Sequence, residues 1–133
     1  MKILPSALAL ALLVPSAAQA QEAERDPRLA YALRCSAAFA ILANEQGRGV
    51  EAALAYPDVQ LRGREFFVRT AAALMDAEGL TRDGVAAEMR REAESLQAEA
   101  AQAPDRAAHQ QEVLGPCLAL LDTSLPALLP PPQ

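Results

Sequence analysis

Apolar positions recur with a helical period in four long segments of the chain. The first, from Pro27 to about Gln46, is apolar around most of its circumference, which is typical of a central, buried helix. The others cover residues 59–78, 82–103 and 106–124, and the third of the four has one narrow apolar seam. Residues 50–56 make at most two short turns. Alternation of apolar and polar residues is absent, so we expect no strands.

Capping residues mark the ends of these segments. Asp26 before Pro27 is a strong helix start, and Thr81 and Asp105 are the expected N-caps of the third and fourth long helices. Gly47 is a candidate for the residue that follows the first helix, and Gly79 ends the second. Short links between four helices predict an all-α fold, an antiparallel four-helix bundle over residues 26–124.

Pro116 interrupts the pattern of the last helix. A proline removes one backbone hydrogen bond, so we expect this helix to be kinked or split at Pro116. Residues 125–133 contain four prolines and are expected to form an extended, Pro-rich tail.

The first twenty residues have the pattern of a secretory signal peptide. Lys2 precedes an apolar stretch over residues 3–14, and Ala18 and Ala20 form a small-residue cleavage site. We expect cleavage before Gln21, a flexible leader over residues 21–25, and export to the periplasm or the extracellular space. The apolar stretch is too short to span a bilayer, so we expect no transmembrane helix after cleavage.

Cys35 and Cys117 are the two cysteines of the chain. An even number of cysteines in a small exported protein predicts a disulfide, here between the first and last helices. Cys35 is near the start of the first helix and Cys117 is near the end of the last. In an up-down-up-down bundle these two ends lie side by side. Redox chemistry usually uses C-x-x-C, which is absent, and one histidine with two cysteines is too few ligands for a typical metal site.

The net negative charge of the chain argues against nucleic acid as a partner. The 133 residues carry 12 Lys+Arg against 17 Asp+Glu, a net charge of -5. Without residues 1–20, and so without the only lysine, 11 arginines face 17 acids, a net charge of −6. An acidic protein is poorly suited to nucleic acid, which requires clustered positive charge. Such a small chain has a marginal core, which a disulfide would brace.

His109 is the single histidine and lies near Asp105 and Glu112 in sequence. A carboxylate–histidine pair could support acid–base chemistry or help to hold a metal, but we expect an exposed histidine that titrates at the surface. Four acids of the third long helix are expected to form a solvated charged face: Glu88, Glu92, Glu94 and Glu99.

Other candidate groups also have simpler interpretations. Met75 and Met89 could be axial haem ligands, but core packing is expected. Three arginines near Phe66 and Phe67 could bind an anion, but ion pairs with Glu65 or Asp58 are expected; they are Arg62, Arg64 and Arg69. We therefore expect no catalytic site, no metal and no cofactor.

Three functional hypotheses remain. The first is a non-enzymatic exported domain that binds a protein or small-molecule partner. The second is a ligand or cofactor carrier with a pocket between helices, lined by Phe67, Met75 and Leu114. The third is an acid-responsive, chaperone-like protein, because protonating its 17 carboxylates changes the charge from about −6 to about +11. The sequence also leaves open a homo-oligomer that forms through the apolar seam of the third long helix.

Overall fold

The computed structural model describes residues 25–125, and this part of the chain contains helices and no strand. The helices are α1 (Pro27–Gly47), α2 (Glu51–Leu54), α3 (Gln60–Glu78), α4 (Arg82–Gln102) and α5 (Arg106–Ser124). The predicted all-α class and four long helices are confirmed. The predicted signal peptide with its cleavage site, leader residues 21–24 and tail residues 126–133 lie outside the described residues.

The predicted N-caps are confirmed by side-chain hydrogen bonds. Asp26 Oδ1 accepts from the Arg28 backbone N–H at 2.8 Å, and Thr81 Oγ1 accepts from that of Gly84 at 3.1 Å. Asp105 Oδ1 accepts from two N–H groups, those of residues 107 and 108, both at 3.0 Å. These bonds satisfy donors that have no partner inside the helix, so local sequence fixes where α1, α4 and α5 begin.

The structure differs from the predicted end of the first helix, and it excludes one of the two alternatives, kinked or split, predicted for the last helix. The glycine in the left-handed region after α1 is Gly49 (φ 72), whereas Gly47 is still helical. The last helix is not split at Pro116, because α5 is continuous from Arg106 to Ser124. Gly115 precedes the proline and has no Cβ to clash with its ring. Pro116 is exposed, so water can satisfy the carbonyl that loses its partner.

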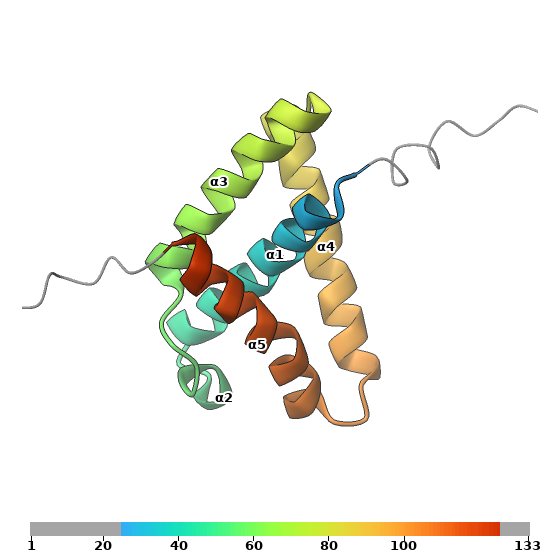
Figure 1. Cartoon of the computed structure of the whole chain (residues 1–133). Helices are drawn as coiled ribbons and strands as arrows, with labels where there is room; N and C mark the ends of the chain where they lie inside the picture. Colours follow the sequence, from blue (N-terminus) through green and yellow to red (C-terminus); the bar gives the residue numbers. More distant parts are fainter. Residues whose placement is uncertain (1–24, 126–133) are drawn as a thin grey trace, which may run out of the picture.

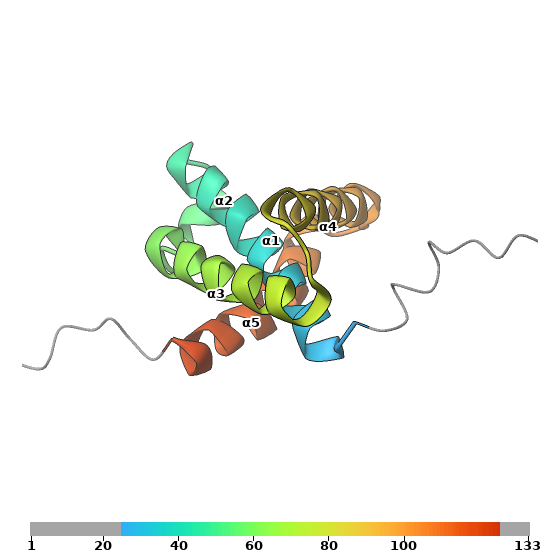
Figure 2. The ribbon, with the colours of Figure 1, turned by 90° about the horizontal axis from the view of Figure 1, so that it is seen from above.

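The helices form a bundle centred on α1. In Figure 1, α3, α4 and α5 follow one another around three sides of a triangle, and α1 runs across it. α1 packs against α3, α4 and α5, as the view from above also shows (Figure 2). The triangle closes where α5 ends beside the start of α3, through an ion pair between Arg62 and Asp122 at 2.6 Å. This arrangement buries α1, as its apolar circumference predicts.

α1 and α3 pack closely against each other. A Cβ at Gly63 would lie 3.0 Å from the Cβ of Phe39, so this glycine lets the two helices approach. Phe39 also meets Phe66 edge to face, with ring centroids 5.5 Å apart. The core continues as two clusters, one around Phe39 and the disulfide and one around Leu33, Leu74 and Val85.

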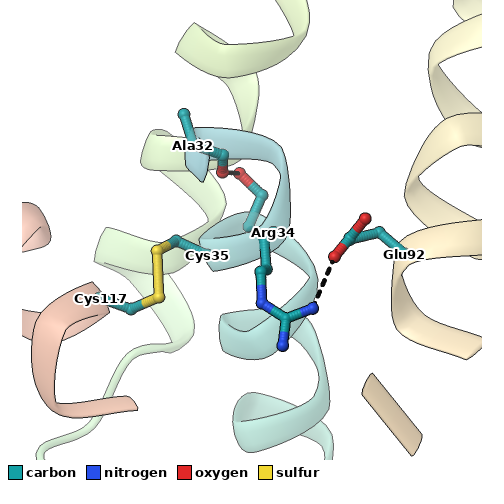
Figure 3. The surroundings of a disulfide bond; sticks show 6 residues. Ala32, Arg34, Cys35, Glu92 and Cys117 are labelled. Atoms are coloured by element: carbon teal, nitrogen blue, oxygen red, sulfur yellow. Dashed lines mark hydrogen bonds and ion pairs between the residues drawn. A yellow bond between two sulfur atoms is a disulfide. The ribbon is translucent and has the colours of Figure 1, made fainter. Parts of the chain in front are cut away.

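The predicted disulfide is confirmed. Cys35 of α1 and Cys117 of α5 are bonded, with Cα atoms 5.3 Å apart and a separation of 82 positions in sequence. Both are buried, in the same cluster as Phe39 and Leu114. Figure 3 shows the bond between the two helices, on the side of α1 away from α4.

One glutamine organises the segment that contains α2. The Gln46 amide donates to the carbonyls of Ala53 at 3.2 Å and Pro57 at 2.9 Å, and its oxygen accepts from the Val59 N–H at 3.3 Å. These bonds hold residues 48–59 against the end of α1, which positions the start of α3.

None of the helices in residues 25–125 is both long enough and apolar enough to cross a membrane.

Candidate functional site

A groove lies on α1 where α4 and α5 diverge. It consists of two hollows that share His109 and Val113 as a common wall. We call them the apolar hollow and the polar hollow. Both are floored by one face of α1, because their α1 residues recur every three or four positions; these are Tyr31, Arg34, Ala38, Ile41, Leu42 and Glu45.

The apolar hollow lies nearer the turn between α4 and α5 and has a volume of about 120 Å³. Its apolar lining is Ala38, Ile41, Leu42, Leu96, Ala100, Val113 and Leu114. Its polar lining is Glu45, Arg106, His109 and Gln110. Small apolar hollows of this kind accept apolar groups of a few carbon atoms.

The polar hollow continues the groove along α1 toward the disulfide and has a volume of about 360 Å³. Its lining is Tyr31, Arg34, Glu99, His109, Glu112, Val113, Pro116 and Cys117. The groove as a whole therefore offers an apolar compartment and a charged compartment side by side.

Arg34 and α4 form the charged wall of the polar hollow. Arg34 donates to both carboxylate oxygens of Glu99, at 3.1 and 2.5 Å, and to Glu92 at 3.0 Å. Figure 3 shows Arg34 extending from α1 to Glu92 of α4. Ser95 donates a further hydrogen bond to Glu99 at 3.1 Å. The hydrogen bonds from Arg34, above all, lower the pKa of Glu99 below its ordinary value of 4.5.

A second arginine connects the N-terminal end of α1 to the turn between α3 and α4. Arg25 donates to both carboxylate oxygens of Glu78, at 2.7 and 2.8 Å, and to Glu88 at 3.3 Å. The bond from Arg25 lowers the pKa of Glu78. Arg25 is the last residue of the predicted leader, and it holds the first residues of the bundle in place.

The prediction of a solvated acidic face on α4 is wrong for three of its four residues. Glu88, Glu92 and Glu99 turn toward α1 and are partly buried by Arg25 and Arg34, whereas Glu94 is exposed. The spacing contains the signal for this arrangement. Glu92 and Glu99 follow the buried Val85 at intervals of seven, so they continue its stripe on the core-facing side.

His109 separates the two hollows and is half-buried, not fully exposed. Of its two sequence neighbours, Glu112 also lines the polar hollow, while Asp105 is used as the N-cap of α5. The structure thus places the histidine at the centre of the groove. The sequence identified His109 as a candidate but not its position in a groove.

The remaining candidates fall outside the groove, except for Leu114. Met75 and Phe67 pack against the Leu33 cluster, whereas Leu114 belongs to the Phe39 cluster, so the predicted pocket of these three residues is wrong. Met89 packs against both clusters. Residues 25–125 contain no group of three or more potential metal ligands.

Two of the three arginines of α3 form ion pairs, Arg62 and Arg69, and no ion pair of Arg64 is formed within residues 25–125. Arg69 pairs with Glu65 at 2.9 Å, and Arg62 reaches Asp122 of α5. Asp58 does not pair with either, because its Oδ1 accepts from the Gln60 N–H at 2.9 Å.

The seam proposed for oligomers is occupied inside the molecule. Val85 and Leu96 of α4 are 3% and 5% exposed and pack against the rest of the bundle. The largest exposed apolar side chains of the described chain lie elsewhere, and include Leu54, Leu61 and Val68.

Comparison with known protein families, with curated proteins and with solved structures finds no match to this chain.

Proposed function

We propose that this protein is an exported, non-enzymatic binding protein that takes a small amphipathic molecule into the groove between α1, α4 and α5. The observation that carries this proposal is the pair of hollows that share His109 and Val113. An apolar compartment next to a charged one suits a ligand with an apolar part and a polar part. Export is supported by the pattern of residues 1–20 and by the disulfide.

Several chemical groups that could serve catalysis have structural roles instead. The two cysteines form the disulfide. The hydroxyls of Ser36 and Thr70 donate to carbonyls one turn back, those of Ala32 and Phe66. Asp105, the carboxylate that precedes His109 by one turn, caps α5. These structural roles favour a binding function over an enzymatic one.

A neutral probe of the right size tests the proposal. 1-Hexanol, titrated into the isotope-labelled, disulfide-bonded protein, should shift the amide signals of Leu96, Val113 and Leu114. It should also raise the melting temperature, because a ligand of the folded state stabilises it by mass action. If hexanol moves none of these signals at millimolar concentration, the proposal is wrong.

A matched pair of variants locates the probe. Ala100 lines the apolar hollow, while its neighbour Ala101 is exposed and lies outside it. Ala100→Leu should fill the hollow and remove the hexanol shifts, and Ala101→Leu should keep them. Both changes put a good helix former in α4, so neither should weaken the helix itself. Equal loss, or equal retention, of binding in the two variants would contradict this site.

A second candidate function rests on a different observation. Two carboxylates of α4 form ion pairs with arginines at the start of the bundle: Glu88 with Arg25, which precedes α1, and Glu99 with Arg34 of α1. Acid removes the charge of the carboxylates, so α4 would be released and its apolar seam exposed, which is what an acid-responsive, chaperone-like protein requires. Circular dichroism during acid titration, with a client aggregation assay, tests this candidate. A bundle that stays closed at pH 2 and protects no client would eliminate it.

A further inference from the structure

The charges around the polar hollow are unequal. Arg34 supplies one positive charge, and Glu99 and Glu112 supply two negative charges, with His109 counted as neutral. Arg34 is already bound by Glu99 and by Glu92, which adds a third carboxylate just beyond the lining. The polar hollow therefore has an excess of negative charge, which attracts a cation.

Glu112 is the carboxylate that is available to a ligand. It is exposed, and no ion pair to it is formed by the described residues 25–125. Tyr31 lines the same hollow from α1 and is 40% exposed, so its ring is accessible from the solvent. A carboxylate and an aromatic ring facing one hollow are the two groups that bind organic ammonium ions.

The apolar hollow has no such excess. The charged groups of its lining are Arg106 and Glu45, which have opposite signs, and its remaining polar residues are His109 and Gln110. A ligand carboxylate in the apolar hollow would be attracted by Arg106 and repelled by Glu45, so the two effects would largely cancel. Only the polar hollow therefore favours one sign of charge. The charged head group of a ligand is expected in the polar hollow and not in the apolar hollow.

We infer that the ligand is an amphipathic organic monocation, with a short alkyl or aryl group in the apolar hollow and an ammonium group in the polar hollow beside Glu112 and Tyr31. This inference rests on the proposed function, and it adds the chemical class of the ligand. The common wall of His109 and Val113 lies at the point where the apolar part of the ligand meets its charged part.

Three probes with the same alkyl chain test the inference at pH 7: hexylammonium, hexanoate and 1-hexanol. Dissociation constants come from amide shifts of the disulfide-bonded protein. Hexylammonium should bind more tightly than hexanol by roughly two- to fivefold, the range of an exposed ion pair, and hexanoate should bind most weakly. The preference for hexylammonium should shrink as salt is added.

Two charge-removing variants assign the preference to Glu112. Glu112→Gln should abolish the advantage of hexylammonium over hexanol, while Glu94→Gln should leave it unchanged. Glu94 is an exposed carboxylate of α4 outside the groove, so it controls for the change in net charge.

The possible failures are distinct. Equal binding of the three probes, or a preference that survives in Glu112→Gln, would overturn the cation assignment and leave the proposed binding function standing. Absence of binding by all three probes would overturn both.

Discussion

Arg34 and Cys35 are consecutive residues of α1 that bind it to two different helices. Arg34 forms ion pairs with Glu92 and Glu99 of α4, and Cys35 forms the disulfide with Cys117 of α5. Figure 3 shows the two side chains leaving α1 in different directions. The polar hollow, lined by Arg34 and Cys117, lies between these attachments, so both contribute to the geometry of the groove.

Removing the Arg34 guanidinium should weaken the attachment of α4. We expect Arg34→Met to lower the free energy of unfolding by about 1 kcal/mol, because it breaks a bidentate pair and a second bond in a partly buried setting. Arg69→Met, which breaks the exposed pair with Glu65, is the control and should cost less than about 0.5 kcal/mol. Urea unfolding measures both, and an equal effect of the two changes would contradict a special role for Arg34.

Stability should fall in acid through Glu78 and Glu99. The pKa of each is lower in the folded protein than its ordinary value of 4.5, because an arginine donates hydrogen bonds to it. Their contribution is complete above the ordinary value and is lost as the pH falls through the lowered pKa. Thermal unfolding measured between pH 7 and pH 2 should therefore show a melting temperature that drops below about pH 4.5.

The same titration on Arg34→Met provides the control. Without Arg34, Glu99 should titrate near its ordinary value, so the acid-dependent loss of stability should be smaller than in the unmodified protein. An identical loss in both proteins would show that other groups control the acid response.

Loss of the disulfide should have the largest effect of any single crosslink or contact. In the chain-entropy account, a bond between residues 82 apart in sequence stabilises by ~4–5 kcal/mol. Replacing Cys35 and Cys117 together by alanine should lower the free energy of unfolding by that order and leave a protein that is largely unfolded at 37 °C. Denaturant unfolding at 10 °C compares the two proteins, and a loss below about 1 kcal/mol would contradict the structural role of the bond.

Gly63 should resist substitution because of its neighbour. Gly63→Ala gains helix propensity of up to ~1 kcal/mol, but the new Cβ would stand 3.0 Å from the Cβ of Phe39. We expect a net loss of about 1–3 kcal/mol as α1 and α3 move apart. Gly47→Ala is the matched control at the end of α1, where the new Cβ meets nothing within 4 Å, and it should be neutral or slightly stabilising. Stabilisation by both changes would show that the helices can separate at no cost.

Local rules predict the helices well and their arrangement only in part. Asp26, Thr81 and Asp105 act as caps because their side chains bond N–H groups two or three residues away, so nearby sequence is sufficient. The pattern around Pro116 leaves a kinked and a split helix as alternatives. The choice between them is harder to predict, because it depends on Gly115 and on exposure to solvent.

The candidate site depends on long-range packing. The groove exists because α4 and α5 diverge over α1, and the two helices are attached by long-range contacts such as Arg34 with Glu99 and Arg62 with Asp122. The orientation of the α4 acids could have been read from the interval of seven that links Val85 to Glu92 and Glu99. Their arginine partners could not, because Arg34 is 58 residues from Glu92 and 65 from Glu99 in sequence.

Intermolecular nuclear Overhauser effects on the hexylammonium complex test the central claim most directly. The account predicts contacts from the terminal methyl group of the probe to Leu96 and Leu114, and from its ammonium-bearing carbon to the ring of Tyr31. Contacts confined to Leu61 and Val68, the exposed apolar residues on α3, would contradict it.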